Sequence, residues 1–311
     1  MRKDMLFTSL IAFLGVFANG VLAQERLPII DMHLHSYDEK NYFVAPDQYG
    51  TMAPPTAEAH FEATYKSMRD NNIVIGVVSN SASSEAAWMS KDVDGRLLRG
   101  FGWFRPSEET IAEFKALAAA GKIDVFGEVG AFYSGMTLAD PHFEPYLEIC
   151  EELGIPVAIH TGGGPPGTTY RGAPRARLSH GDPLLIEDVL VRHPRLKIYL
   201  MHAGVLFYEN ALRLMMSYPQ VYADLGVVLW VHDVPKHYGR EFLLLAKEFG
   251  MLDRVMFGSD QMVWPHGIDA SIERLESFDF LTNEEKRDIL YNNAARFLGL
   301  SEELIAEHHS R

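Results

Sequence analysis

The sequence contains little cysteine and comparatively little positive charge, and each shortage excludes certain kinds of site or partner. Cys150 is the only cysteine in 311 residues, so an intramolecular disulfide is impossible and a structural zinc site built from several thiolates is excluded. Asp and Glu number 42 against 28 Lys and Arg, which gives a net charge of -14. This balance argues against nucleic acid or an anionic membrane as a partner, because such partners select basic patches.

The first 23 residues have the pattern of a secretory signal peptide. Arg2 and Lys3 form a short basic start, and residues 5–17 are mostly apolar but too short to span a bilayer comfortably. Residues 21–23 suit a cleavage site, so we expect cleavage after Ala23; an uncleaved membrane anchor is the alternative. We therefore expect an exported, periplasmic or secreted protein that has no other membrane contact and folds as a single domain over residues 24–311.

Short β-rich runs alternate with longer amphipathic stretches through the remaining sequence. Several runs are apolar throughout, as expected of parallel strands buried on both faces. We expect eight strands, at residues 27–31, 72–80, 97–104, 123–130, 155–162, 196–204, 220–226 and 253–260. The stretches between them predict helices at residues 58–69, from 107, and at 142–153, 183–193, 209–218, 240–249, 268–278 and from 281.

Eight strand–helix units predict an α/β fold, a (β/α)8 or TIM barrel. An open, doubly wound sheet is the alternative, and it is disfavoured because no Gly-x-Gly-x-x-Gly fingerprint follows the first strand. The longest irregular stretch is residues 162–183. A loop of that length inside a compact domain is usually functional.

Metal-binding residue types occur where the expected strands end. The stretch "IIDMHLHSYDE" places His33 and His35 on one face of the first strand, because alternate residues of a strand point the same way. Strand ends in a barrel meet at one mouth. A lone His-x-His pair is weak evidence, but five strand ends together offer four histidines and two acids: His33, His35, Glu128, His160, His202 and Asp260.

Nitrogen from His33, His35 and His160 and oxygen from Asp260 would form a mixed ligand set. Zinc favours such a set, and manganese or iron would also accept it. Two loops offer substrate contacts. Tyr170 and Arg171 follow the fifth strand and Arg105 ends the third, and a guanidinium suits a carboxylate or phosphate. The alternative is that these arginines are solvated or pair with the chain's excess acids.

The sequence resembles the amidohydrolase superfamily, in particular the amidohydrolase-related branch that includes aminocarboxymuconate-semialdehyde decarboxylase. The resemblance rests on "IIDMHLH", "GEVG", "PYLEICEELGIPVAIHTG", "LKIYLMHAG", "YADLG", "DRVMFGSD" and "NNAARFLGL". It implies a TIM barrel of the metal-dependent hydrolase type, in which His33, His35, His160 and Asp260 bind a divalent metal and His202 acts on the substrate. Glu128 matches the glutamate that TatD-like hydrolases carry on strand 4, so the resemblance leaves open whether the site holds one metal ion or two. We favour one tight ion, with Glu128 close by or completing a second site.

The resemblance implies catalysis by metal-activated water, with Asp260 accepting its proton and His202 helping to polarise the scissile group. We expect a hydrolase acting on a small, carboxylate-bearing molecule. A decarboxylase would use the same atoms, and hydrolysis is favoured because an exported protein more often hydrolyses incoming compounds. A metal-binding barrel without turnover is a third hypothesis, and a homo-oligomer is compatible with the sequence.

Overall fold

The computed structural model describes residues 26–102 and 105–311. The expected signal peptide lies outside the described residues, as do Trp103 and Phe104, with which the predicted third strand ends. Within the described part of the chain, no helix has the length and apolar character needed to cross a membrane.

The eight expected strands are present and all their pairings are parallel. They form two hydrogen-bonded groups, β1-β2-β3 and β4-β5-β6-β7-β8. Their bounds are β1 Ile29–His35, β2 Ile73–Ser79, β3 Leu97–Arg99, β4 Phe126–Val129, β5 Val157–His160, β6 Ile198–Met201, β7 Val221–Asp224 and β8 Val255–Met256.

Main-chain hydrogen bonds bridge both seams between the two groups of strands. On one side, the N–H of Asp124 donates to the carbonyl of Arg99 at 2.9 Å. On the other side, the N–H of Met32 donates to Phe257 at 3.0 Å, and that of Asp260 donates to His33 at 2.8 Å. The sheet is therefore closed, which confirms the predicted (β/α)8 barrel.

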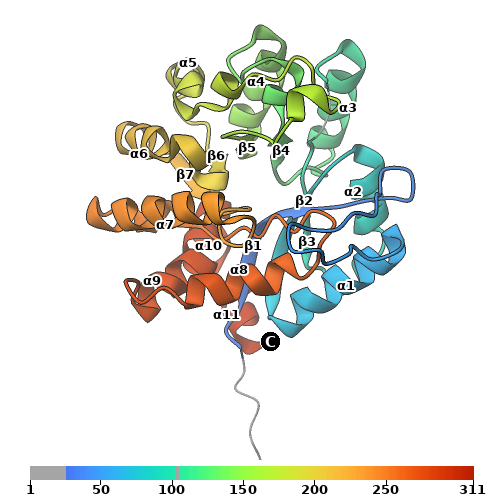
Figure 1. Cartoon of the computed structure of the whole chain (residues 1–311). Coiled ribbons are helices and arrows are strands. Elements are labelled where there is room, and N and C mark those ends of the chain that lie inside the picture. The colour runs from blue at the N-terminus through green and yellow to red at the C-terminus, as the bar shows by residue number, and fades with distance from the viewer. Residues whose placement is uncertain (1–25, 103–104) are drawn as a thin grey trace, which may run out of the picture.

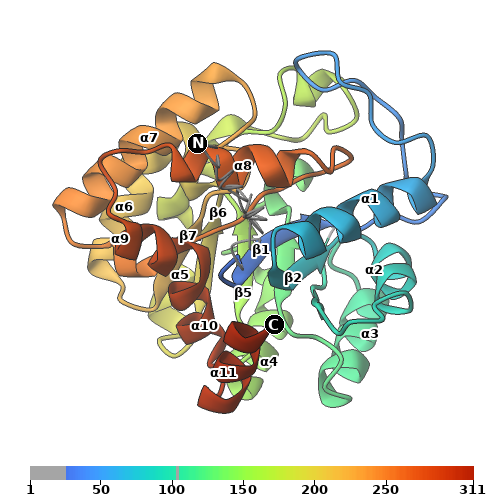
Figure 2. The ribbon, with the colours of Figure 1, turned by 90° about the horizontal axis from the view of Figure 1, so that it is seen from below.

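Helices surround the strands, which occupy the middle of the molecule in Figures 1 and 2. The helices that follow strands β1 to β8 in turn are α1 Ala57–Asp70, α2 Ala82–Met89, α3 Glu108–Ala119, α4 Glu144–Leu153, α5 Glu187–Arg192, α6 Tyr208–Ser217, α7 Asp233–Glu248 and α8 Gly267–Glu276. Three more complete the described chain: α9 Asn283–Arg287, α10 Asn293–Leu298 and α11 Glu302–Ser310.

The barrel interior is filled with side chains. An inner cluster contains Ile30, Met32, Val74, Ala158, Tyr199 and Met256, and Phe297 of α10 belongs to the same cluster. Tyr199 donates its hydroxyl to the carbonyl of Met32 at 3.0 Å, so its polar end is satisfied inside the barrel. The polar residues at the C-terminal strand ends lie outside this apolar cluster and converge at the C-terminal mouth of the barrel.

Some features differ from the sequence-based expectations. Helix α2 was not predicted, because it is only eight residues long and rich in serine. Helix α7 begins seven residues earlier than expected. Pro235 lies in its first turn, where proline is tolerated. Gly239 lies inside the helix because a Cβ at this position would come within 2.7 Å of the carbonyl oxygen of Val228. Near the end of the chain, no helix was predicted to begin at Glu302, but α11 forms there and buries His308, whose Nδ1 lies 2.9 Å from the hydroxyl of Tyr291.

Candidate metal centre

The six predicted site residues, five as metal ligands and His202 as a group that acts on the substrate, lie together at the C-terminal mouth of the barrel. Two come from β1 and one each from β4 and β5, one directly follows β6, and one lies four residues after the end of β8; each is at most 6% exposed. They are His33, His35, Glu128, His160, His202 and Asp260. The structure therefore brings together side chains separated by up to 227 residues in sequence, as the barrel geometry predicts. Their roles as ligands stay predictions.

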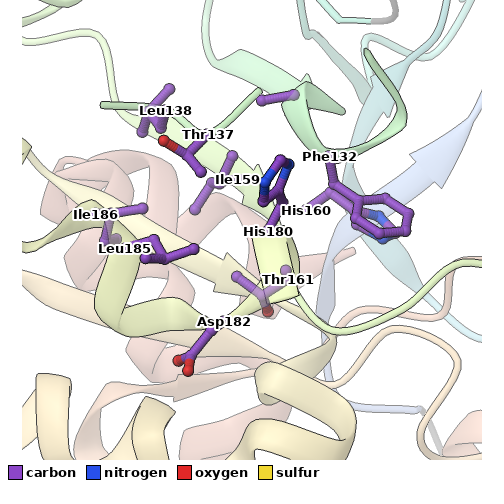
Figure 3. A pocket seen from close by; sticks show the side chains of 12 residues that line it. Phe132, Thr137, Leu138, Ile159, His160, Thr161, His180, Asp182, Leu185 and Ile186 are labelled. Atoms are coloured by element: carbon purple, nitrogen blue, oxygen red, sulfur yellow. The ribbon is translucent and has the colours of Figure 1, made fainter. Parts of the chain in front are cut away.

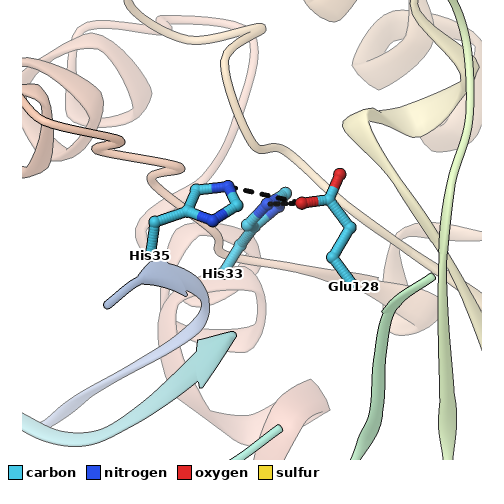
Figure 4. A group of neighbouring side chains, drawn as sticks. All are labelled: His33, His35 and Glu128. Atoms are coloured by element: carbon cyan, nitrogen blue, oxygen red, sulfur yellow. Dashed lines mark ion pairs between the residues drawn. The ribbon is translucent and has the colours of Figure 1, made fainter. Parts of the chain in front are cut away.

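Glu128 lies between two pairs of histidines. Its Oε2 is 3.7 Å from His33 Nε2 and 3.3 Å from His35 Nε2, and Figure 4 shows both rings turned toward this carboxylate. Its Oε1 is 2.6 Å from His160 Nδ1 and 3.5 Å from His202 Nε2. Each carboxylate oxygen of Glu128 thus faces a different pair of imidazoles.

Asp260 approaches three of the same imidazoles. Its Oδ1 is 3.1 Å from His35 Nε2. Its Oδ2 is 3.7 Å from His33 Nε2 and 3.6 Å from His202 Nδ1. The two carboxylates and four imidazoles therefore form one continuous polar cluster.

The donor set fits one or more divalent cations. Three groups of side chains each place ligand atoms within 4.8 Å of one another: His33, His35 and Glu128; His33, His202 and Asp260; and Glu128, His160 and His202. Within the described residues, the buried atoms His33 Nε2, Glu128 Oε2 and His160 Nε2 make no hydrogen bond. Leaving such atoms buried and unbonded costs about 1–3 kcal/mol each, and a bound cation would remove that cost.

Burial and charge act in opposite directions on the cluster. Burial would lower the pKa of His33, but the carboxylates of Asp260 and Asp224 raise it well above its usual value. Burial would raise the pKa of Asp260, but the imidazoles of His33 and His35 lower it to about 2. In the same way, hydrogen bonds from His160 and His202 hold the pKa of Glu128 well below its usual value. Both carboxylates are therefore anionic and attract cations.

Three residues outside the predicted set contact the side chain or backbone of His33 and His35. Gln261 clamps the backbone of His35, accepting from its N–H at 2.9 Å and donating to its carbonyl at 2.8 Å. Asp31 Oδ1 accepts from the N–H groups of His33 and Ser259 at 3.0 Å each, which ties β1 to the segment after β8. Asp224 contacts His33 Nδ1 at 3.0 Å. The sequence signal for Asp224 was an acid ending an apolar strand, as for Asp260.

Aromatic rings flank the cluster. The ring of Tyr133 lies 5.0 Å from that of His160, Phe132 stacks on His160 at 5.7 Å, and Tyr37 lies 6.4 Å from His35. Burial, with the charges of Glu128 and Asp260, raises the pKa of Tyr133, so its hydroxyl stays protonated. Aromatic side chains thus border the buried cluster.

A small cavity lies beside His160 and is lined by residues that follow β4 and β5, including Phe132, Thr161 and His180 (Figure 3). Its volume of about 10 Å³ holds at most one water molecule. It is therefore too small to receive a substrate in this conformation. His180 belongs to the 162–183 loop that the sequence indicated as functional.

The predicted substrate-binding residues are not part of the buried cluster. Arg105 and Arg171 are exposed, and the side chain of Tyr170 is 91% exposed. Among the described residues, no hydrogen bond or ion pair joins these three side chains to the six clustered ones. Their role as substrate contacts stays a prediction.

Comparison with known proteins agrees with this geometry. The family model of amidohydrolases matches residues 30–300. No curated protein sequence gives a significant match. Solved structures share the fold at low identity. An uncharacterized TIM-barrel protein from Bordetella bronchiseptica is 20% identical with a TM-score of 0.66, and the match covers 92% of this chain and 100% of the other.

Two other solved structures are similar over comparable lengths. A probable 2-pyrone-4,6-dicarboxylic acid hydrolase from Acinetobacter baumannii, solved with citric acid bound, is 17% identical; the match covers 88% of this chain and 99% of the other, with a TM-score of 0.61. A 5-carboxyvanillate decarboxylase from Sphingomonas paucimobilis is 14% identical; the match covers 88% and 100%, with a TM-score of 0.59. At these identities the likeness shows the fold alone.

Proposed function

This chain belongs to the amidohydrolase family, and from that premise we propose that it is a metal-dependent hydrolase acting on a small, carboxylate-bearing substrate. The observation that carries the proposal is the position of Glu128, with one oxygen toward His33 and His35 and the other toward His160 and His202. A carboxylate that faces two sets of imidazoles suits a hydrolytic site that would hold two ions.

The residues divide naturally between two ion positions. His33, His35 and Asp260 with Glu128 Oε2 would hold a tight ion, which we propose is zinc, although manganese or iron would accept the same donors. His160 and His202 with Glu128 Oε1 would hold a second, weaker ion. When bound, such an ion acidifies water and polarises the scissile carbonyl or phosphoryl oxygen.

The chain's own groups then supply the proton transfers. Asp260 is ionised and buried in the cluster, so it can accept a proton from the attacking water and deliver it to the leaving group. His202 Nδ1 lies 3.6 Å from Asp260 Oδ2. When only the tight ion is bound, His202 is not a ligand and would instead stabilise negative charge that develops on the substrate. The burial of the cluster strengthens these electrostatic interactions.

The substrate class is supported by structural neighbours that act on carboxylated compounds. The Acinetobacter baumannii structure is named a 2-pyrone-4,6-dicarboxylic acid hydrolase, and the Sphingomonas paucimobilis structure a 5-carboxyvanillate decarboxylase. We propose that Arg105, Tyr170 and Arg171 contact a substrate carboxylate when the loops that carry them close over the mouth. A guanidinium binds a carboxylate through paired hydrogen bonds.

The test is turnover by protein stripped of metal with a chelator and reloaded with Zn²⁺ or Mn²⁺. Candidate substrates are carboxylated lactones, amides and phosphoesters. A new acid group formed only in the reloaded protein supports hydrolysis. Released carbon dioxide would instead assign the protein as a decarboxylase. Binding of metal without turnover of any substrate would indicate a barrel that has lost catalysis.

We also propose that the protein is exported, on the strength of the pattern in residues 1–23. The full-length chain is expressed in a bacterial host, and the protein is recovered from the periplasm or medium. Amino-terminal sequencing should then begin at Gln24. Recovery of an uncut chain from the membrane fraction would support the anchor instead.

A further inference from the structure

Asp224 ends strand β7 and contacts two separate parts of the cluster. It is fully buried. Its Oδ2 lies 3.0 Å from His33 Nδ1, while its Oδ1 accepts from the N–H groups of His202 at 2.8 Å and Gly226 at 2.9 Å. One carboxylate therefore connects the first predicted ligand to the turn that follows β6.

The contact with His33 determines which nitrogen of that ring is available. A carboxylate only accepts hydrogen bonds, so Nδ1 carries the hydrogen and Nε2 faces Glu128 and Asp260. Glycine at two neighbouring positions leaves space for this ring, because a Cβ on Gly226 would lie 2.5 Å from His33 Nδ1 and one on Gly258 would lie 2.9 Å from His33 Cβ. The hydrogen bond from His33 Nδ1 to Asp224 thus selects the tautomer of the ring.

The contact with His202 holds a strained turn. His202, Ala203, Gly204 and Val205 have φ values of 65°, 50°, 78° and 46°. Three of these residues are not glycine, and such conformations persist only where surrounding groups fix them. Asp224 Oδ1 fixes the start of the turn, and Thr161 Oγ1 accepts from the N–H of Gly204 at 3.1 Å. The turn directs His202 toward Glu128 and Asp260.

We propose that Asp224 is a positioning residue of the metal centre, which keeps His33 Nε2 available for a divalent cation and holds the turn that aims His202. This inference rests on the proposed metal-dependent function. Asp224 is not itself a ligand in this arrangement, because its two oxygens are engaged by His33, His202 and Gly226. Partners that orient a metal-binding imidazole commonly affect metal affinity by about 10–100-fold.

Asp47 provides a matched control on the same face of the barrel. Its Oδ1 accepts from the N–H groups of Tyr49 and Thr51 at 2.8 Å each, and its Oδ2 lies 2.9 Å from His266 Nε2. Asp47 therefore repeats the arrangement of Asp224, with two backbone donors on one oxygen and an imidazole on the other. His266 is not among the clustered ligands. The same substitution at both positions changes the same kind of contact.

The experiment measures Zn²⁺ affinity by chelator competition for the metal-stripped full chain, Asp224→Asn and Asp47→Asn. In Asp224→Asn, the amide oxygen stays against the two backbone donors, so the amide nitrogen faces His33 Nδ1 and drives the ring hydrogen to Nε2. Zn²⁺ affinity should fall by about 10–100-fold, whereas Asp47→Asn should bind like the unsubstituted protein. Equal affinity in all three proteins would overturn the positioning role but leave the proposed function standing.

If the unsubstituted chain binds no Zn²⁺, the proposed function and this inference both fail. A second measurement does not depend on the folding of Asp224→Asn. Long-range ¹H–¹⁵N NMR of the Zn²⁺-loaded unsubstituted protein with labelled histidine should show His33 bound through Nε2 and protonated at Nδ1. The His33 signal is assigned by its loss in His33→Gln. Coordination through Nδ1 would overturn the proposal.

Discussion

Two buried histidines of this barrel, His60 and His33, have surroundings that shift their pKa values in opposite directions. His60, on α1, is fully buried among the rings of Tyr37, Tyr42 and Trp88, at 5.4, 5.4 and 5.6 Å. Burial lowers the pKa of His60 to about 4. His33 is equally buried, yet neighbouring carboxylates raise its pKa well above the usual value.

The comparison shows that burial alone does not make a histidine a metal ligand. His60 has aromatic neighbours and stays a neutral packing group. The clustered histidines lie beside Glu128 and Asp260, and the negative charge of these carboxylates attracts a cation. Position in the fold explains the difference, because the clustered residues end parallel strands whereas His60 lies within a helix.

The largest expected effect comes from His33→Ala. This substitution removes the imidazole that approaches both Glu128 and Asp260, at 3.7 Å each. Metal binding should be lost, and turnover should fall by about a thousandfold, because a bound ion contributes several kcal/mol to catalysis. Metal analysis and kinetics on the substrate found in the screen test this. His60→Phe, in the aromatic group, should retain both properties; a metal-free His60→Phe would contradict the comparison.

Glu128→Gln should have the next largest effect. The amide removes the negative charge shared by the two histidine pairs, so the weaker ion near His160 and His202 should be lost first. Metal titration should then show about one ion bound where the unsubstituted protein binds two, with reduced turnover. An unchanged titration would show that the two oxygens of Glu128 do not serve two positions.

His60→Phe should also change the dependence of stability on pH. The folded pKa of His60 is about 4 against 6.5 for an unperturbed histidine, so the unfolded chain takes up a proton first as the pH falls. As the pH falls from 6.5 to about 4, His60 therefore lowers the free energy of unfolding by about 1.4 kcal/mol for each pH unit. Urea denaturation of metal-free protein at pH 7, 6 and 5 should show a shallower decline in His60→Phe. Identical slopes would mean that His60 is protonated in the fold.

The smallest expected effect is that of Arg171→Ala. Arg171 is exposed, and an exposed ion pair contributes about 1 kcal/mol or less, so KM should rise by no more than about tenfold with kcat unchanged. Arg195→Ala is the control, because Arg195 is exposed, precedes β6 and pairs with Glu151 at 3.6 Å. Equal KM values for the two variants would remove Arg171 from the substrate site.

Much of this arrangement could be predicted from sequence, because strand ends are recognisable. The apolar runs before His35, His160 and Asp260 indicated parallel strands, and parallel strands in a closed barrel deliver their last residues to one mouth. Asp224 was not assigned, although it also ends an apolar run. Its role depends on pairing with a ring 191 residues away, which no local pattern reveals. Gln261 and the strained turn at 202–205 depend on tertiary contacts in the same way.

The most direct test of the central claim is the metal content of the purified chain. Elemental analysis after extensive dialysis should find at least one tightly held transition-metal ion per chain, with zinc the expected element, and none in His33→Ala. A chain that purifies without metal and takes up none on addition of Zn²⁺, Mn²⁺ or Fe²⁺ would contradict the account.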